Sequence, residues 1–526
     1  MRTLPLAAGR HPGRRDGGVG PRWRRPSQSV RQIVGSDDMS EIYAPDVNED
    51  RDGPTLRLAR FAAETRAADL PPVALEGARR LLLDTIACAV AAWDLPSSRI
   101  VRELLEEQGG RQESSVLVSG AKLPAPAAAY LNAHLSNAID ADDTLNYSAH
   151  IAASAVAPAL AIAERVGASG LDTLAAIALG YEVAGRIGLS LRGLVVTPDG
   201  SFTFAPVTGY GWTSFAAAVA SGRLLGVDSS RMRHAFGLAA AATPLPTSGK
   251  FGLDLPRPMT KYGLYGEMAQ GGVMAALLAQ RGFTADTTVL DGERGLWRMA
   301  GSLDCDWTAL TDGIGTRWLV DEASYKSYPG CRFLNPAIDV FLDILRDEGL
   351  RADEVERVEA LVPGSAIAKH MNDPSVESMV DGCFSLPYLL ACAALAGPPG
   401  PGWHTDETRS DPAVRRFSAK VDVGVEPRAA DAAKEDLTRY GHSVRMCTTV
   451  TVETAERRFT RSADYARGDS YTPQTRATAA DIADKFRRYT VDVLGRERSE
   501  RALAFGRELE AMDDLHQFMA CLTTRA

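Results

Sequence analysis

Residues 154–188, SAVAPALAIAERVGASGLDTLAAIALGYEVAGRIG, hold two apolar segments separated by Ala-Ser-Gly. Within each segment apolar residues recur at three- and four-residue steps, the period of an α-helix with a buried face. Many of these residues are Ala or Gly, and small side chains let helices approach closely. The same pattern recurs from residue 55 to about residue 281. We therefore expect a tightly packed helical domain.

The apolar period changes after about residue 319. Residues 355–362, 417–425 and 444–452 are rich in β-branched side chains and alternate in the manner of strands. Helical character returns after about residue 475 and continues to the C-terminus. We predict a mainly α fold, in which both ends of the chain build one large all-helical domain and the middle forms an α+β lid domain. The expected boundaries are 1–45 for a disordered Arg-rich extension, 46–318 and 471–526 for the helical domain, and 319–470 for the lid.

Composition and charge exclude several classes of protein. The 526-residue chain is 45% hydrophobic and 24% charged, which is typical of globular proteins rather than disordered ones. A net charge of −9 argues against nucleic acid as a partner. No apolar run of about 18 residues occurs, so we expect no membrane span. Seven cysteines without a C-x-x-C pair predict neither a disulfide framework nor a zinc site, and favour a reducing cytoplasm.

The densest cluster of ionisable residues is Asp140-Ala-Asp142-Asp143-Thr144, followed by His150. Carboxylates beside an imidazole can form an acid/base pair. They can also bind a metal, but this segment lacks the Gly and distal Glu of a calcium loop and has no second His at ligand spacing. A structural role explains the same residues: Asp142 and Asp143 would cap the following helix, and His150 would be an interior side chain.

A second cluster is cationic, and it comprises Arg257, Lys261, Lys326 and Arg332 around Gly and Pro residues. Basic side chains that meet at a pocket bind carboxylates or phosphates, and otherwise they are solvated surface charges. Only eight lysines occur in this Arg-rich chain, which shifts the balance towards function. Motifs for phosphate loops, serine hydrolases and zinc peptidases do not occur in the sequence.

Seven segments in order resemble the MmgE/PrpD family, which includes 2-methylcitrate dehydratase and cis-aconitate decarboxylase. The resemblance covers nearly the whole chain from Leu56. The segments are LPPVALEGARRLLLDTIACAVA (70–91), AYLNAHLSNAIDADDT (129–144), HIAASAVAPALAIAERVGASG with GYEVAGRIG (150–188), TKYGLYGEMAQGGVMAALLAQRGFTA (260–285), SYKSYPGCRFLNPAIDV (324–340), CFSLPYLLACA (383–393) and ARGDSY with ADKFRRY (466–489).

The resemblance implies a helical domain formed by both chain ends, a middle lid, an active site between them and a homodimer. It also implies chemistry on a small carboxylate substrate without a cofactor or a metal. Position by position, it assigns catalytic roles to His150, Asp140, Thr144, Lys261 and Tyr388. Lys326 would hold a substrate carboxylate, and the nearby residues Arg332, Cys331, Asn146 and Asn335 are expected to contact substrate.

The assigned chemistry is physically reasonable. Removal of a proton next to a carboxylate builds negative charge on that carboxylate, which cations such as Lys261 and Lys326 would stabilise. An imidazole such as His150 exchanges protons near neutral pH, and Asp140 would orient it.

The sequence also departs from the family pattern at several positions. Asn137, Asn146 and Asn335 stand where members often have histidine, and the YGLYG loop after Lys261 lacks another. We therefore expect a substrate other than methylcitrate. The leading hypothesis is a lyase that eliminates water from a hydroxylated carboxylic acid after α-proton abstraction. The alternatives are a decarboxylase or an epimerase/isomerase acting through a similar carbanion, and a non-catalytic binding protein with the same fold.

Overall fold

The computed structural model describes residues 52–146, 149–196, 202–205, 210–244, 255–366 and 369–524. The Arg-rich extension expected at residues 1–45 lies outside this range, so its prediction is not tested. The described chain is mainly helical with a small mixed sheet, as the sequence predicts.

The first part of the chain forms a helical layer around α4 (Pro72–Ala91), a helix that buries most of its side chains. Pro72 lies in the first turn of this helix, where the missing N–H costs no hydrogen bond. Small residues line the contacts between helices: a Cβ at Gly272 of α12 would lie 2.4 Å from the main-chain oxygen of Ser214 in α9. The other helices are α3 (Pro54–Glu64), α5 (Pro96–Gln108), α6 (Ala125–Asn137), α7 (Ala152–Val166), α8 (Gly170–Ser190), α9 (Ser214–Leu224), α10 (Ser229–Ala241), α12 (Thr260–Gln280), α13 (Leu296–Met299) and α14 (Trp307–Thr311).

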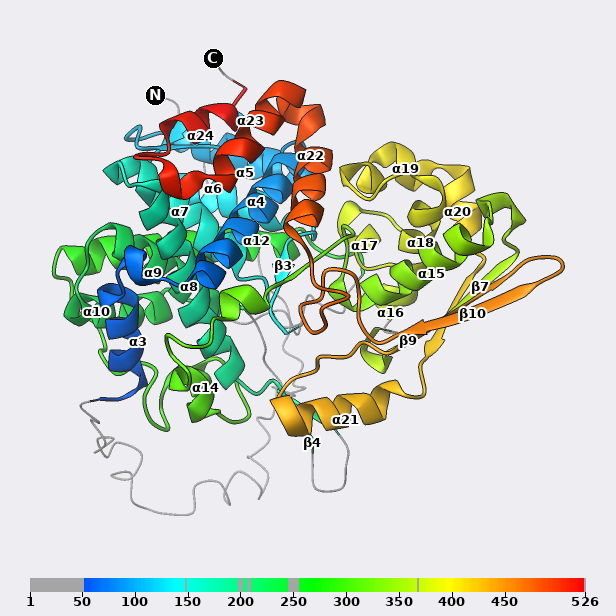
Figure 1. The fold of residues 1–526 in the computed structure, drawn as a ribbon, viewed down its shortest axis with the longest axis horizontal. Coiled ribbons are helices and arrows are strands. Elements are labelled where there is room, and N and C mark those ends of the chain that lie inside the picture. Colours follow the sequence, from blue (N-terminus) through cyan, green and yellow to red (C-terminus); the bar gives the residue numbers. More distant parts are fainter. Residues whose placement is uncertain are drawn as a thin grey trace, which may run out of the picture. The chain divides into compact units, whose positions relative to one another are not determined.

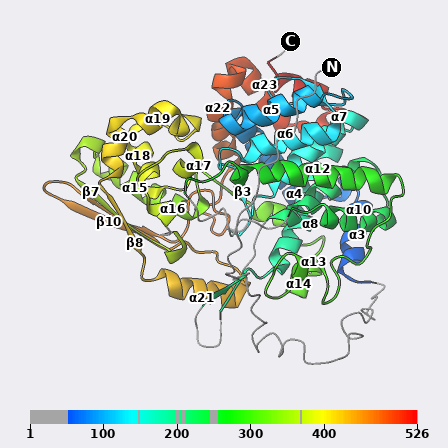
Figure 2. The same ribbon diagram turned by 180° about the vertical axis from the view of Figure 1, so that it is seen from behind.

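The C-terminus returns to this helical layer. The helix α22 (Ala479–Leu494) begins with a capping box in which Thr478 and Asp481 satisfy each other's main-chain N–H groups. It packs along α4, and α23 (Arg496–Arg507) also contacts α4. Figures 1 and 2 show these orange and red helices, with α24 (His516–Cys521), beside the blue helices from the start of the chain. Both ends of the chain therefore form one helical layer.

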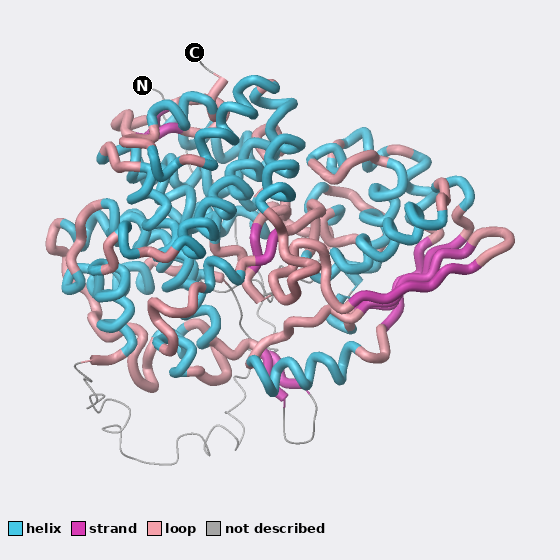
Figure 3. The backbone as a smooth tube through the Cα atoms, in the orientation of Figure 1, coloured by secondary structure: helices cyan, strands magenta, loops and turns pink. Residues whose placement is uncertain are grey.

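The middle of the chain is an α+β region with a four-stranded sheet in the order β10-β9-β7-β8. The pair β7–β8 is parallel, and the other two pairs are antiparallel. Figure 3 shows the strands as one magenta band. The strands are β7 (Arg357–Val362), β8 (Val421–Val425), β9 (Thr448–Glu453) and β10 (Arg458–Ala463). The helices of this region are α15 (Asn335–Glu348), α16 (Lys369–Asn372), α17 (Met379–Gly382), α18 (Leu386–Leu395), α19 (Asp406–Ser410), α20 (Pro412–Ser418) and α21 (Ala429–Tyr440).

Two details of the sheet differ from the sequence prediction. The strand expected at 417–425 begins only at Val421, because Asp411 caps α20 and its helix continues to Ser418. Strand β10 was not expected, since its sequence RFTRSA has no buried apolar face. It is held by main-chain pairing with β9, and Phe459 and Ala463 pack against the core while only partly buried.

Short strand pairs interrupt the layer that we expected to be all-helical. The pair that matters for the site joins β3 (Asp143–Thr144) to β6 (Ser324–Tyr325). Next to it, Gly468 has a φ of 86°, and a Cβ there would lie 1.9 Å from the main-chain oxygen of Tyr325. Only glycine fits this close approach. The other short strands are β1 (Ser114–Ser115), β2 (Lys122–Leu123), β4 (Leu194–Val196) and β5 (Phe202–Phe204).

The seven cysteines are all buried free thiols. No single helix of the described chain is long and apolar enough to cross a membrane. The helices α4 and α5 reach that limit only when taken together, with a bend of 93° between them.

Candidate functional site

Pairing of β3 with β6 brings the acidic segment and the loop of Lys326 together. The ladder is antiparallel and pairs Asp143 with Tyr325 and Thr144 with Ser324. In this register the residue after Tyr325 lies beside the residues before Asp143. The Nζ of Lys326 is accordingly 2.5 Å from Oδ1 of Asp140, although 186 positions separate them.

The backbone at Asp140 adopts a left-handed turn directly after α6. Its φ is 54°, a conformation that Asp tolerates better than most residues. The main-chain oxygen of Asp140 accepts hydrogen bonds from Nζ of Lys326 and from the N–H of Gly330, each at 3.0 Å. Asn146 has a φ of 51°, so two positive-φ residues flank the acidic segment. Such strained residues concentrate at functional sites.

His150 contacts two of the three aspartates of the segment. Its Nδ1 lies 3.0 Å from Oδ1 of Asp142, and its Nε2 lies 3.8 Å from Oδ1 of Asp140. The amide of Asn137 donates to both carboxylate oxygens of Asp142 at 3.0 Å and fixes that carboxylate. Asp142 is therefore better placed than Asp140 to orient the imidazole, which revises the sequence expectation.

Asp143 has a structural role. Its carboxylate accepts hydrogen bonds from the main-chain N–H groups of Ile151 and Ala152 at the start of α7, and from the hydroxyl of Tyr181. Burial and the nearby charge of Asp142 raise the pKa of Asp143 well above its ordinary value. The capping role that the sequence suggested is thus found at Asp143 and not at Asp142.

Positive charge dominates the surroundings of Asp140. Burial alone would raise the pKa of this carboxyl, but the charges of Lys326, Lys261 and His150 outweigh burial and hold the pKa below its ordinary value. The pKa of Asp142 is also lowered against the effect of burial, mainly by His150. Both carboxylates are therefore ionised at neutral pH.

Lys261, in the first turn of α12, is the cation without an ion-pair partner among the described parts of this site. Its Nζ lies 4.6 Å from the ring centre of Tyr262 and 5.6 Å from that of Phe384. Burial lowers the pKa of the ammonium group, and the charge of Asp140 acts in the opposite direction. A half-buried ammonium group that has anionic neighbours but no ion pair of its own favours the binding of an external anion.

Three polar groups between residues 140 and 150 are buried without a hydrogen-bond partner in the described structure: the hydroxyl of Thr144, Nδ2 of Asn146, and Nδ1 of His150, whose 3.0 Å contact with Asp142 is an ion pair without hydrogen-bond geometry. The first two belong to residues that are 3% and 7% exposed. Buried polar groups are nearly always hydrogen-bonded, so each exception needs an explanation. Ligand binding would satisfy the first two groups.

Two residues that we expected to contact substrate, Arg332 and Asn335, bind the protein through their side chains. The guanidinium of Arg332 bonds to the buried carboxylate of Asp469 and donates to the main-chain oxygen of Tyr325 at 3.0 Å. The amide of Asn335 donates to the main-chain oxygen of Cys331 at 3.1 Å. Burial and the charge of Asp140 raise the pKa of the Cys331 thiol. These contacts hold the loop around Lys326 in place.

The structure does not bring Tyr388 to the carboxylate cluster. Its hydroxyl donates to the main-chain oxygen of Trp403, and its ring stacks on that of His404 at 6.1 Å between ring centres. Within the described chain, Tyr388 makes no hydrogen bond with His150 or either lysine. Its geometry is that of a residue that positions the Trp403 loop.

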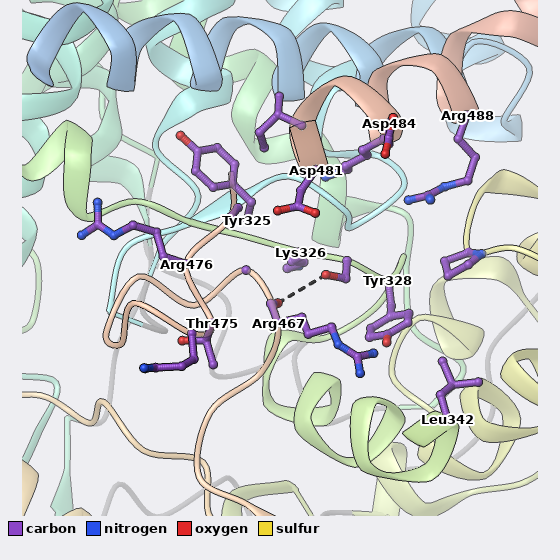
Figure 4. A pocket seen from close by; sticks show the side chains of 17 residues that line it. Tyr325, Lys326, Tyr328, Leu342, Arg467, Thr475, Arg476, Asp481, Asp484 and Arg488 are labelled. Carbon is purple, nitrogen blue, oxygen red and sulfur yellow. Dashed lines mark hydrogen bonds between the residues drawn. The ribbon is translucent and has the colours of Figure 1, made fainter. Parts of the chain in front are cut away.

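Lys326 also borders a charged cavity of about 440 Å³ on its other side. Figure 4 shows Asp481, Asp484 and Arg488 projecting from α22, with Arg467 on the opposite wall. Two of its arginines are paired with acids: Arg467 with Asp339, and Arg476 with Asp321. This cavity is therefore largely self-neutralised.

The carboxylates and the imidazole also form the one candidate metal-binding group found in the described residues. Asp140, Asp142 and His150 each offer a ligand atom, and these atoms lie within 4.8 Å of one another. However, the ammonium of Lys326 lies against Asp140 and already compensates its charge. The residues therefore fit a metal ion poorly, and the expectation of chemistry without a metal or cofactor stays a prediction.

The profile of the MmgE/PrpD N-terminal domain matches residues 56–305, and that of the MmgE/PrpD C-terminal domain matches residues 328–511. These two matches cover most of the chain in the expected order. The chain belongs to the MmgE/PrpD family. The resemblance inferred from the seven segments is thus confirmed.

Several characterised relatives of this MmgE/PrpD protein are cis-aconitate decarboxylases. It is 31% identical over 311 residues to that of Aspergillus terreus, covering 56% of this chain and 61% of the relative. The human cis-aconitate decarboxylase is 23% identical over 84% of this chain and 88% of its own length. A cis-aconitate decarboxylase-like protein of Aspergillus oryzae, oryM, is 29% identical over 46% and 50%. The chain thus spans only about half to three fifths of the fungal relatives it matches.

Sequence reasoning missed the partner of His150 in this MmgE/PrpD site. Asp142 and Asn137 were both noticed, the first as a helix cap and the second as a missing histidine. Their contact depends on the left-handed turn at Asp140, which reverses the chain between them. The only sequence signal was three carboxylates within four residues.

Proposed function

We propose that this protein is a cofactor-independent lyase that acts on a small polycarboxylic acid through a carbanion next to a carboxylate. The observation that carries the proposal is Lys261, a half-buried lysine that has no ion-pair partner in the described site and lies within electrostatic reach of Asp140. A substrate carboxylate would supply the missing partner. When the carbanion forms, its charge moves onto that carboxylate, and the ammonium would stabilise it.

Decarboxylation is the reaction that the relatives favour. The bond between a substrate carboxylate and its neighbouring carbon breaks, carbon dioxide leaves, and the electron pair delocalises towards the carboxylate at Lys261. The imidazolium of His150 then gives its proton to the carbanion, while Asp142 holds Nδ1 and stabilises the charged ring. The names of the relatives in three organisms support this order of preference.

Dehydration remains the second candidate, because the sequence favoured it and Thr144 supplies a suitable group. Here neutral His150 takes a proton from the carbon next to the carboxylate, and the electron pair then expels hydroxide from the adjacent carbon. The imidazolium of His150 gives its proton to the leaving hydroxide, so that water departs and the neutral imidazole is restored, and a hydrogen-bond donor beside the leaving oxygen assists its departure. The unpartnered hydroxyl of Thr144 supports this role.

The test is product analysis with purified protein. cis-Aconitate and a set of 2- and 3-hydroxy polycarboxylates are incubated, and carbon dioxide, new alkenes and solvent deuterium in recovered substrate are measured. We expect carbon dioxide from an unsaturated tricarboxylate. Alkene formation without carbon dioxide would select dehydration, and deuterium exchange alone would select the isomerase. A chain that binds these acids without any of the three outcomes is a binding protein.

The variant that tests the mechanism is His150→Asn, with His134→Asn as its control. Both histidines are buried, but His134 lies in α6, and burial lowers its pKa to about 4. Loss of a proton-transfer group reduces turnover by about 10²- to 10⁴-fold. We expect that loss for His150→Asn only. Equal turnover in the two variants would remove His150 from the mechanism.

A further inference from the structure

A second cavity of about 410 Å³ opens beside the carboxylate cluster, and nothing in the proposed reaction uses it. Apolar side chains from several elements form much of its wall, whereas seven charged side chains line the cavity behind Lys326. The apolar lining includes Leu189, Leu191, Trp212, Phe333 and Met446.

Two residues connect this cavity to the site. Asn146 lines it and lies four positions before His150, within a turn that the Leu145–Ala149 bridge closes. Tyr210 also lines it and stacks on Tyr265 at 6.4 Å between ring centres, and Tyr265 meets the ring of His150 edge-on at 6.0 Å. The charge of Asp140 adds to burial in raising the pKa of Tyr210 to about 12. The cavity therefore adjoins the cluster through Asn146, with the ring of Tyr265 between Tyr210 and His150.

The polar atoms at this junction are suited to hold a ligand. Asn146 lines the cavity, and its Nδ2 is buried and lacks a hydrogen-bond partner in the protein. A carboxylate or carbonyl oxygen of a ligand would satisfy this donor. Beyond it the wall is largely apolar, and a small polycarboxylate has no apolar part to fill such a space.

We propose that the substrate is a polycarboxylic acid that carries an apolar substituent, such as an unbranched alkyl chain, and that this cavity binds the substituent. The inference rests on the proposed function, since it assumes that the carboxylates bind at Lys261. The Asn146 amide marks the boundary between the charged part of the substrate and its apolar part. This division also explains why the position carries a neutral amide rather than a titratable imidazole.

The test separates binding from turnover by using dicarboxylates that need not react. Succinate, butylsuccinate and octylsuccinate are titrated calorimetrically into the protein. Each buried methylene contributes about a fourfold gain in affinity, so the dissociation constant is expected to fall steeply along this series until the cavity is full. A dissociation constant that does not change with chain length overturns the proposal.

Variants locate the effect. Leu189→Asn changes a cavity residue at the end of α8, and Leu104→Asn changes a leucine of α5 that is 53% exposed and does not line the cavity. We expect Leu189→Asn, and independently Phe333→Ser, to flatten the dependence on chain length while succinate binds as before. The control is expected to keep the full dependence. A dependence that survives both cavity substitutions places the alkyl chain elsewhere and overturns the assignment.

The outcome also distinguishes the two proposals. Chain-length-dependent binding without turnover of any acid would reject the lyase and keep the cavity assignment. Turnover of short acids without any chain-length dependence would keep the lyase and reject the cavity assignment. Turnover that rises about fourfold per methylene with alkyl-substituted aconitates would support both.

Discussion

Two buried lysine–aspartate pairs in this protein have nearly the same geometry but different surroundings. Lys326 pairs with Asp140 at 2.5 Å, and Lys485 pairs with Asp84 at 2.6 Å. Each lysine also donates to a main-chain oxygen of the acidic segment. The pair at Lys485 joins α22 to α4 and so ties the end of the chain to its beginning.

The pKa values of the two carboxyls separate the pairs. Burial raises the pKa of Asp84, and the charge of Lys485, its main compensating cation, lowers that pKa by less than burial raises it. The pKa of Asp140 is lowered although it is equally buried, because Lys261 and His150 add their charges to that of Lys326. A buried pair with balanced charges is a structural link. A pair with surplus positive charge around it is an anion-binding site.

The largest expected effect comes from replacing each pair as a whole. Asp140→Asn/Lys326→Met and Asp84→Asn/Lys485→Met both remove a buried ion pair without leaving one charge behind, so both proteins should fold. We expect turnover to fall at least about 10³-fold in the first and to be largely retained in the second. Steady-state rates, normalised to folded protein by circular dichroism, make the comparison. Equal losses in both would show that the two pairs do not differ in function.

The second prediction concerns stability. Lys485→Met alone leaves Asp84 as an uncompensated buried charge, which costs about 3–5 kcal/mol of unfolding free energy. Denaturant unfolding measures this loss. The double variant Asp84→Asn/Lys485→Met should recover most of it. If the single and double variants are equally stable, the pair does not link α22 to α4 in the way described.

The third prediction concerns the surplus cation. Lys261→Met should reduce turnover by about 10²- to 10³-fold, the usual cost of one stabilising group, with little loss of stability because no carboxylate loses its partner. Lys261→Arg keeps the charge at all working pH values. Burial lowers the pKa of Lys261. We therefore expect kcat/KM of the wild type to fall in alkali at a pH below the pKa of an ordinary lysine, which is about 10.4. The Lys261→Arg variant should not show this fall of kcat/KM at alkaline pH. If the fall persists in the variant, it is caused by the titration of a group other than Lys261.

The smallest effect is expected at Asp143, the structural member of the acidic segment. Loss of its capping contacts in Asp143→Ala should cost about 1 kcal/mol of unfolding free energy, with turnover per folded molecule retained. The pKa of Asp143 is raised in the folded state, so the free energy that its side chain contributes to folding is fully present at pH values below the pKa of Asp in the unfolded chain. That free energy is lost as the pH rises through the higher pKa of Asp143 in the folded protein. The deficit of the variant should thus be largest in acid and shrink towards neutral pH. Chemical unfolding at several pH values tests this, and a deficit that grows with pH would contradict it.

The fold was largely predictable, since it depends on local periodicity. The helices around residues 154–188 and the strand near residues 444–452 have apolar patterns that only one type of element buries. Strand β10 has no such pattern, because an edge strand is held by main-chain bonds. The extent of α20 was missed because the apolar face of the following strand continues backwards into Phe417.

The candidate site was predictable only in its residue types. The sequence and its family resemblance selected Asp140, His150, Lys261 and Lys326, and the structure brings them together. Tyr388 and Arg332 were chosen in the same way, but their polar groups are engaged by Trp403 and Asp469. Whether a side chain chosen from the sequence faces the site or the rest of the protein depends on long-range contacts that no local pattern contains.

The sequence by itself determined the helical layer, the mixed sheet, the family and the cations available for an anionic substrate, because burial of apolar side chains and the supply of charges are properties of composition and spacing. Only the tertiary structure decided which aspartate orients His150, which lysine lacks an anionic partner and where an apolar cavity meets the cluster. The physical reason is that charge balance and cavity walls arise from residues far apart in the chain, as with Lys326 and Asp140, which the two-residue ladder between β3 and β6 places side by side.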